Sequence, residues 1–291
     1  MGKPFFSIII PTLNEERYLP NLLSDLYKQT FKDYEVIIVD AKSEDKTLQR
    51  AERSRKKIKN FSILKSDKRN VSYQRNLGAH IATADWLIFM DADNRLPGYF
   101  LQGIKFHIEM LNPDILSTWI NPDSQNKRDK AATILANLYI ELQKTTKKPQ
   151  VLESLLCINR TSFNKLGGFN ENIHWAEGSY LIQKAKKKKM KFHIVREPKY
   201  TFSFRRLRKQ GGLRTIRLAE LEISRLRGKK LPEDKEKQLY PMEGGKYFEI
   251  DQESASRIEK LFLKLINSRP KDKLKTKLIN RVYNLIKSKL L

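Results

Sequence analysis

The chain has 291 residues and 40% of them are hydrophobic, so it can bury a sizeable core and is globular rather than disordered in composition. Its formal net charge of +25 favours anionic partners such as nucleotides, nucleic acid or an acidic membrane surface. The single cysteine excludes an internal disulfide, and the sequence has no cysteine–histidine cluster typical of a zinc site.

The N-terminus lacks the layout of a secretory signal peptide, because Met1-Gly2-Lys3-Pro4 leads straight into a strand-like run. No apolar run approaches the roughly eighteen residues that a membrane-spanning helix needs. We therefore expect a cytoplasmic protein, either free or attached peripherally to the inner face of the membrane.

The first hundred residues alternate between strand and helix patterns. Short apolar runs typical of buried strands lie at 5–10, 35–39, 61–64 and 86–90. Helical spacing or composition is found at 18–26, 45–59 and 72–82. Asn14 is the predicted cap of the first helix. This alternation predicts βαβ units and a doubly wound, parallel sheet of the α/β class.

The pattern changes after about residue 150. The sequence predicts a strand at 151–158, a turn at Gly167-Gly168-Phe169, a basic helix through 185–189 and a further strand at 192–195. From about Arg205 the chain is basic and helical in pattern. We therefore divide the chain into a catalytic-type domain at 1–206 and a basic helical extension at 207–291.

Polar residues recur where the predicted strands end. Pro11-Thr12 follows the first strand, Asp40 the second, and Asp91-Ala92-Asp93 the fourth. In an open α/β sheet the ligand crevice lies beyond the carboxyl ends of the strands. We therefore expect these residues to share a ligand.

Asp91 and Asp93 can both turn toward one hard cation, because they are separated by a single residue. Mg²⁺ and Mn²⁺ take oxygen ligands, usually one or two carboxylates together with phosphate oxygens of the substrate. The alternative is an ordinary turn, in which Asp and Asn are common because they bond their own backbone.

Five motifs in order extend this interpretation: Ser7-Ile8-Ile9-Ile10-Pro11-Thr12-Leu13-Asn14-Glu15, Val36-Ile37-Ile38-Val39-Asp40 with Ser43-Glu44-Asp45-Lys46-Thr47, Arg75-Asn76-Leu77-Gly78-Ala79, Asp91-Ala92-Asp93 and Gly167-Gly168-Phe169. In this order and spacing the sequence resembles the family 2 glycosyltransferases of the GT-A fold over about residues 5–206. The resemblance implies a Rossmann-like, mostly parallel sheet flanked by helices. It also implies transfer of a sugar, with inversion, from a UDP- or GDP-sugar to an acceptor hydroxyl or a lipid-linked phosphate or glycan.

The resemblance also implies roles for particular residues. The donor nucleotide would be bound by the residues of the first four motifs, namely Pro11, Thr12, Asn14, Glu15, Asp40, Arg75, Asn76, Asp91 and Ala92. Asp91 and Asp93 would ligate Mn²⁺ or Mg²⁺ through the donor diphosphate. Arg75 would help to neutralise that diphosphate, because a guanidinium can bridge two phosphate oxygens.

The sequence departs from the family pattern at two positions. Ala41 stands where many members have a second acid that contacts the nucleobase of the donor. The sequence therefore does not indicate which nucleobase the donor carries. Gly178 stands where the family usually has the Asp of a Glu-Asp pair, so Glu177 is the predicted catalytic base. Trp175 could supply an apolar wall for a sugar, and Glu171 is an alternative base. The departures also fit a catalytically silent, nucleotide-binding family member.

Arg205 and Arg206 resemble a basic pair that several members place near the donor diphosphate or the acceptor phosphate; alternatively they begin a solvated helix. Apolar residues of 258–266 and 274–286 fall on helical faces surrounded by Lys and Arg. Such helices suit an anionic membrane surface, or else pack on the catalytic domain. Nucleic-acid binding is the less favoured explanation of the charge, because lysines are spread along the chain without a zinc-finger or RNP-like motif.

Overall fold

The computed structural model describes residues 2–144, 146, 149–173, 176–205 and 208. Their strands are β1 (Phe6–Thr12), β2 (Tyr34–Asp40), β3 (Phe61–Lys65), β4 (Trp86–Met90), β5 (Ile115–Pro122), β6 (Leu155–Asn159) and β7 (Phe192–Phe202). Their helices are α1 (Leu19–Tyr27), α2 (Thr47–Glu52), α3 (Val71–Ile81), α4 (Phe100–Leu111), α5 (Lys127–Gln143), α6 (Arg160–Leu166) and α7 (Glu177–Lys187). Trp175, Arg206 and almost all of the predicted 207–291 extension lie outside the described residues.

The seven strands form one sheet in the order β3-β2-β1-β4-β6-β5-β7. β1 lies between β2 and β4 and runs parallel to both, and β2 runs parallel to β3. β6 runs antiparallel to its two neighbours, β4 and β5. The prediction of a mostly parallel α/β sheet is therefore confirmed, with the first four strands parallel and β6 antiparallel.

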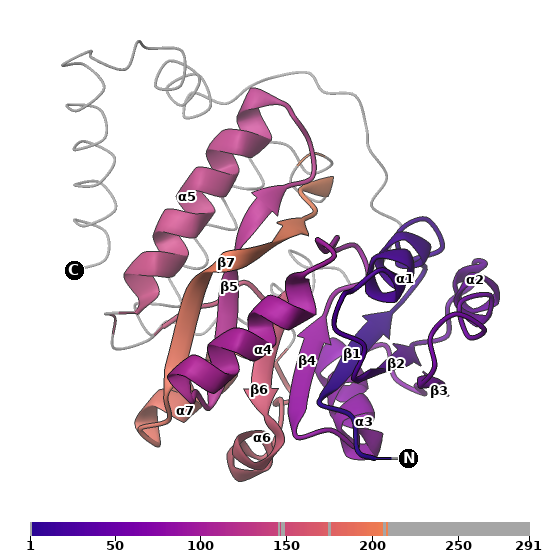
Figure 1. The fold of residues 1–291 in the computed structure, drawn as a ribbon, viewed down its shortest axis with the longest axis horizontal. Coiled ribbons are helices and arrows are strands. Elements are labelled where there is room, and N and C mark those ends of the chain that lie inside the picture. Colours follow the sequence, from indigo (N-terminus) through magenta and orange to yellow (C-terminus); the bar gives the residue numbers. More distant parts are fainter. Residues whose placement is uncertain (1, 145, 147–148, 174–175, 206–207, 209–291) are drawn as a thin grey trace.

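Helices cover both faces of the sheet, so the fold has three layers (Figure 1). On one face α1 and α4 pack through residues such as Leu22, Leu26 and Ile104. On the other face α3, α6 and α7 pack through residues such as Phe163 and Ile182. This burial of apolar side chains on both sides explains why the strands are continuous apolar runs.

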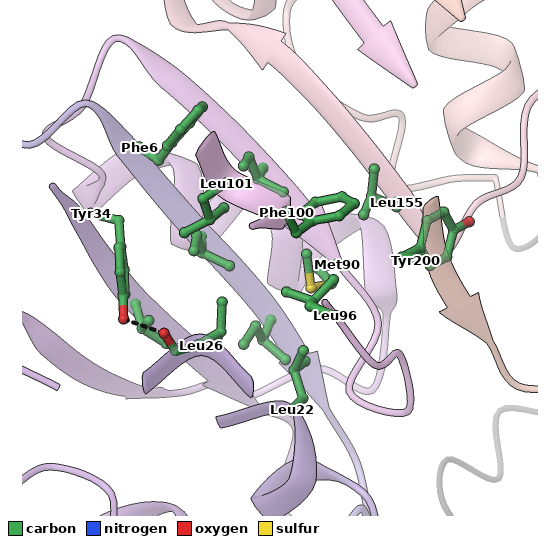
Figure 2. Close-up of a cluster of buried hydrophobic side chains, with 14 of the residues drawn as sticks. Phe6, Leu22, Leu26, Tyr34, Met90, Leu96, Phe100, Leu101, Leu155 and Tyr200 are labelled. Carbon is green, nitrogen blue, oxygen red and sulfur yellow. Dashed lines mark hydrogen bonds between the residues drawn. The ribbon is translucent and has the colours of Figure 1, made fainter. Parts of the chain in front are cut away.

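The first of these cores extends across the sheet from β2 to β7. Figure 2 shows Tyr34 of β2, Phe100 of α4 and Tyr200 of β7 among its side chains. The hydroxyl of Tyr34 donates a hydrogen bond of 2.6 Å to the backbone oxygen of Leu26, which satisfies the polar end of a buried ring. The ends of the central strands are thus anchored in a packed core.

Three local predictions differ from the structure. Asn14 does not cap α1, because that helix begins at Leu19 and the side chain of Asn14 accepts a hydrogen bond from the backbone of Glu44 instead. The predicted helix 45–59 is shortened to α2, which is followed by turns. The predicted strand 151–158 begins only at Leu155, so residues 151–154 form a loop at the strand's start.

No helix among the described residues is both long enough and apolar enough to cross a membrane.

Candidate active site

The ends of β1, β2 and β4 bring the predicted site residues to one edge of the sheet. Thr12 lies opposite Asp40 in the parallel register of β1 and β2, and Asp91 follows the last residue of β4. Because neighbouring parallel strands end at the same edge of the sheet, the polar residues that follow them lie close together, although they are far apart in the sequence. The predicted grouping of these residues is therefore found in the structure.

Asp40 ties the ends of β1 and β2 together. Its carboxylate accepts hydrogen bonds from the Thr12 hydroxyl at 2.8 Å, the Ser43 amide at 2.9 Å and the Ser43 hydroxyl at 2.5 Å. The side chain is fully buried. Asp40 therefore shapes the wall of the crevice, and its direct contact with a nucleoside stays a prediction, as does that of Pro11.

The loop after β1 is fastened to the loop after β2. The amide of Asn14 donates to the Ser43 hydroxyl and its side-chain oxygen accepts from the amide of Glu44, both at 2.8 Å. The amide of Glu15 donates to the Thr47 hydroxyl at 2.8 Å. These bonds hold Asn14 with a positive φ of 56° and leave the Glu15 side chain to pair with Arg205.

Arg205 bridges two acids that are far apart in the sequence. Its terminal nitrogens bind both carboxylate oxygens of Glu15 at 3.0 and 2.8 Å, and its Nε lies 2.9 Å from Asp93 Oδ2. Its guanidinium also stacks 4.2 Å from the ring centre of Tyr18. Burial raises the pKa of Glu15 to about 7, with Asp93 and Asp91 adding to the effect and Arg205 opposing it.

Arg75 bridges a second pair of acids from the opposite side. Its Nη1 pairs with Glu177 Oε1 at 2.5 Å and its Nη2 with Asp91 Oδ1 at 2.9 Å, while Nη2 also donates to the backbone oxygen of Glu153 at 2.9 Å. Only 2% of the side chain is exposed. Arg75 is thus committed to carboxylates, and its direct contact with a donor phosphate stays a prediction.

The neighbours of Arg75 in its motif have separate structural roles. Asn76 donates to the backbone oxygen of Phe169 at 2.9 Å and accepts from the Phe169 amide at 2.9 Å, so it fastens α3 to the 167–169 turn. A Cβ added at Gly78 would lie 2.5 Å from Ile9 Cγ2, so this glycine lets α3 approach the sheet. The predicted donor contact of Asn76 is not visible in these bonds and stays a prediction.

Asp91 and Asp93 retain free coordination capacity at the crevice. Each uses one carboxylate oxygen for an arginine, and among the described residues the other oxygen has no protein partner. Their side chains are 36% and 14% exposed. Burial raises the pKa of Asp91 to about 6, opposed by Arg75 and reinforced by Asp93 and Glu177. Both acids therefore remain able to bind a further positive charge.

The donor set fits a substrate-assisted cation site rather than a cage made of protein ligands. In the described part of the chain no group of three or more His, Cys, Asp or Glu residues is arranged to hold a metal ion. Mg²⁺-type sites that use one or two carboxylates complete their shell with water and substrate phosphate. Asp91 and Asp93 fit this second kind of site.

The start of α7 is contacted by an acid that the sequence did not single out. Glu153, in the loop before β6, accepts hydrogen bonds from the amides of Gly178 and Ser179 at 2.5 and 3.0 Å, and from the Ser179 hydroxyl at 2.8 Å. Burial and the nearby Glu177 raise the pKa of Glu153 to about 8, against the effect of Arg75. The apolar run 151–158 gave no signal for this position, because Glu153 reads there as one polar residue of a strand.

Of the other predicted residues, Ala92 is buried between the two aspartates, and the predicted wall residue Trp175 and the basic Arg206 lie outside the described residues. We call Glu15, Asp91, Asp93, Glu153 and Glu177 the acid cluster. Glu171 is separate from it, because its Oε1 accepts a hydrogen bond from the side-chain amide of Asn76 at 3.1 Å. It lines a cavity of about 480 Å³ beside the 167–172 loop that none of the clustered acids line.

Comparison with known proteins identifies the family. A family model described as glycosyl transferase family 2 matches residues 7–169. The PGL/p-HBAD biosynthesis glycosyltransferase of Mycobacterium bovis (strain BCG / Pasteur 1173P2) is 39% identical over 97 residues, which make up 33% of this chain and 38% of that protein. Poly(ribitol-phosphate) beta-N-acetylglucosaminyltransferase TarS of Staphylococcus aureus (strain Mu50 / ATCC 700699) is 33% identical over 114 residues, or 38% of this chain and 20% of TarS. The matched segments thus span well under half of these relatives.

Solved structures show the same architecture. Mannosyltransferase PcManGT from Pyrobaculum calidifontis, in complex with GDP-Man and Mn²⁺, has a TM-score of 0.62 at 18% identity and covers 84% of this chain and 70% of its own. S. aureus TarS 1–349 in complex with UDP-GlcNAc has a TM-score of 0.56 at 21% identity, over 82% of this chain and 71% of its own. These likenesses confirm the predicted GT-A type fold. With the family model matching more than half of its length, the chain belongs to glycosyl transferase family 2.

Proposed function

We propose that this protein transfers a sugar, with inversion, from a nucleoside-diphosphate sugar to an acceptor hydroxyl. The observation that carries the proposal is the placement of Asp91 and Asp93 at the end of β4, each with one carboxylate oxygen available among the described residues. Structural neighbours in complex with UDP, with UDP-GlcNAc, and with GDP-Man and Mn²⁺ support a nucleotide-sugar donor and a divalent cation.

In this proposal Asp91 and Asp93 would hold Mn²⁺ or Mg²⁺, and the cation would supply charge stabilisation for the departing diphosphate. Arg75 and Arg205 keep the two aspartates in place, because each arginine holds one of them through a short ion pair. The fixed arrangement costs little reorganisation when charge develops on the leaving group. The crevice wall built by Thr12 and Asp40 would receive the nucleoside.

Inversion by direct displacement requires a base that takes the proton of the acceptor hydroxyl. The carboxylates around the start of α7, Glu177 and Glu153, are the candidates. Glu177 is the base expected from the sequence, and its carboxylate is buried and paired with Arg75. A carboxylate held by a guanidinium is a weakened base, since protonation breaks the ion pair.

The acceptor is proposed to be a glycan or a lipid-linked phosphate or glycan. A relative from Methanococcus voltae, 39% identical over 92 residues, is named as acting on a dolichyl N-acetylglucosaminyl phosphate. We place the activity in the cytoplasm or at the inner face of the membrane. Flotation of the full chain and of a chain lacking residues 254–291 with anionic liposomes tests this, because equal flotation would contradict a membrane role for the basic helices.

The donor and the cation are tested together. Wild type and Asp93→Ala are assayed with UDP-, GDP- and other nucleotide sugars in the presence of Mn²⁺, following release of the nucleoside diphosphate. We expect metal-dependent release by wild type and a decrease of about 10²–10³-fold in Asp93→Ala, because several kcal/mol of leaving-group stabilisation is lost. If the two proteins are equally inert across the panel, the proposed activity is wrong.

A catalytically silent family member is the second candidate, and Gly178 favours it because the usual acid is absent there. It predicts that a nucleoside diphosphate binds in the presence of Mn²⁺ but that no donor is turned over. Calorimetric titration alongside the assay separates the two candidates.

A further inference from the structure

The first turn of α7 is completed by a residue from another part of the chain. The residue before the helix, Ala176, has a left-handed backbone with φ of 58° and offers no side-chain cap. The amides of Gly178 and Ser179 donate instead to the carboxylate of Glu153. This carboxylate arrives from the loop before β6, whose backbone is held by Arg75 and, one residue later, by Asp91. Glu153 is therefore fixed at both its backbone and its side chain.

Glu153 occupies the space that a side chain at position 178 would need. A Cβ built on Gly178 would lie 2.4 Å from Glu153 Oε2 and 3.3 Å from its Cδ. Real Cβ atoms do not approach other heavy atoms this closely. An acid at 178 and the observed Glu153 conformation thus exclude each other, and the carboxylate of Glu153 stands where the absent Asp would begin.

The other clustered acids already have a positively charged partner. Glu15 and Asp93 are bound by Arg205, and Asp91 and Glu177 by Arg75. Within the described residues Glu153 has no ion pair, and its partners are two amides and a hydroxyl. Glu153 is also half-buried as a residue, whereas the side chain of Glu177 is only 5% exposed. Glu153 is thus the one acid of this group that no arginine binds through its carboxylate among the described residues.

We propose that Glu153, and not Glu177, is the base of the sugar transfer, an inference that rests on the function proposed above. The Glu153 carboxylate takes the proton of the acceptor hydroxyl as the acceptor oxygen bonds to the anomeric carbon. The bond from that carbon to the diphosphate oxygen breaks, and the nucleoside diphosphate leaves with the electron pair. Glu177 acts as a positioning residue that holds Arg75 between the base and Asp91.

The electrostatic surroundings agree with this role. The titratable and charged groups around Glu153 are Glu177 on α7, Arg75 on α3 and Tyr200 on β7. Burial and Glu177 raise the pKa of Glu153, and a carboxylate with a raised pKa is a stronger base. Arg75 and the hydrogen bonds from Ser179 oppose this rise in the pKa of Glu153, which keeps the group able to ionise near neutral pH.

The first test compares Glu153→Gln with Glu109→Gln, a substitution at an exposed position of α4, in the full chain, using the donor that wild type turns over fastest. We expect Glu153→Gln to lower kcat by about 10²–10⁴-fold, the usual contribution of a positioned base, while donor affinity changes by less than about threefold. The rate of wild type should rise with pH and level off, and Glu153→Gln should lack that rise. Glu109→Gln should keep kcat within about threefold of wild type, since Glu109 is an exposed residue of α4 with no proposed role at the donor or the acceptor.

The second test moves the acid to position 178 and remains valid if Glu153 variants fold poorly. Glu153→Ala is compared with the double variants Glu153→Ala/Gly178→Asp and Glu153→Ala/Gly178→Asn. We expect the variant with Asp at position 178 to recover at least about tenfold in kcat over Glu153→Ala. The variant with the isosteric Asn should recover none, because only the carboxylate can accept the proton. Equal recovery by both would show that the site needs only a helix cap and would overturn the proposal.

The two proposals fail in different ways. If wild type is active and requires Asp93, but Glu153→Gln keeps more than about a third of its kcat, the assignment of Glu153 is wrong and the proposed function stands. If wild type is inert with every donor, the proposed function itself falls.

Discussion

The two arginines of the site hold acids in different parts of the fold. Arg75 is carried by α3, is 2% exposed and joins Asp91 to Glu177. Arg205 follows the last described strand, β7, joins Glu15 to Asp93 and is also buried, with 9% of its side chain exposed. Each arginine is thus a buried bridge between two acids. Arg75 does this from α3, and Arg205 does it from the segment that follows β7.

The difference between the arginines follows from their surroundings. Arg75 stacks 5.4 Å from the ring centre of Phe169, and its Nε is buried without a hydrogen-bond partner among the described residues. Only strong compensating ion pairs make such burial tolerable. Arg205 stacks on the ring of Tyr18 with all of its guanidinium nitrogens paired. The Arg75 bridge is therefore expected to govern stability, and the Arg205 bridge to govern charge at the crevice.

The largest expected effect is the loss of Arg75. Arg75→Met leaves Asp91 and Glu177 without a countercharge, so we expect a decrease of about 3–5 kcal/mol in the free energy of unfolding. Arg205→Met should cost less, about 1–3 kcal/mol, because Glu15 with its pKa near 7 can take up a proton when its partner is lost. Urea unfolding of both variants, with Arg53→Met at an exposed position as control, measures the difference. Equal losses for the two arginines would contradict the comparison.

A smaller effect is expected from the packing that places Arg75. In Gly78→Ala the new Cβ would meet Ile9 Cγ2 at 2.5 Å and Val39 Cγ2 at 3.1 Å, so α3 must shift on the sheet. We expect a loss of about 1–3 kcal/mol in stability, as for other overpacked cores, together with a lower kcat.

The matched control for this substitution is Gly98→Ala, whose Cβ would meet nothing closer than 3.5 Å. It should change the stability by less than about 0.5 kcal/mol. If Gly78→Ala unfolds at the same urea concentration as this control, the close approach of α3 to β1 is not needed to hold Arg75.

The smallest expected effect is the pH dependence on the Arg205 side. Burial raises the pKa of Glu15 from 4.5 to about 7, so the folded state binds a proton more tightly than the unfolded state does. The stabilising contribution of protonated Glu15 is complete below about pH 4.5 and is lost as the pH rises through about 7. Between about pH 5 and pH 8, Glu15→Gln should therefore lose less stability than wild type. Thermal unfolding at several pH values tests this, and parallel curves for the two proteins would refute it.

The predictable part of the fold is the part made of local patterns. The apolar runs that became β1, β2, β3 and β4 were recognised because each is bounded by polar or turn residues and contains a continuous apolar stretch. The segment 96–150, which became α4, β5 and α5, carried no motif and was not predicted. The antiparallel course of β6 could not be read either, because strand direction depends on the path of the chain between strands.

The site also has a part that the sequence predicted and a part that it did not. The ion pairs join Asp91 and Glu177 to Arg75, and Asp93 to Arg205, so residues named separately in the sequence lie together. The sequence did not reveal that Arg75 and Arg205 are occupied by carboxylates rather than left facing a ligand. Nor did it reveal Glu153, since its bonds to Gly178 and Ser179 join residues 25 and 26 positions apart and leave no local pattern.

The sequence by itself determined that polar residues follow apolar strands, and hence that acids and hydroxyls gather at one edge of a sheet. It could do so because strand burial and strand ends are written in residues that are close neighbours in the chain. Only the tertiary structure decided which acid pairs with which arginine, and that Glu153 occupies the space left by Gly178. Those outcomes depend on side chains that are as many as 190 positions apart in the sequence, such as Glu15 and Arg205. They also depend on close packing, which leaves room for the Glu153 carboxylate but not for a side chain at position 178 as well.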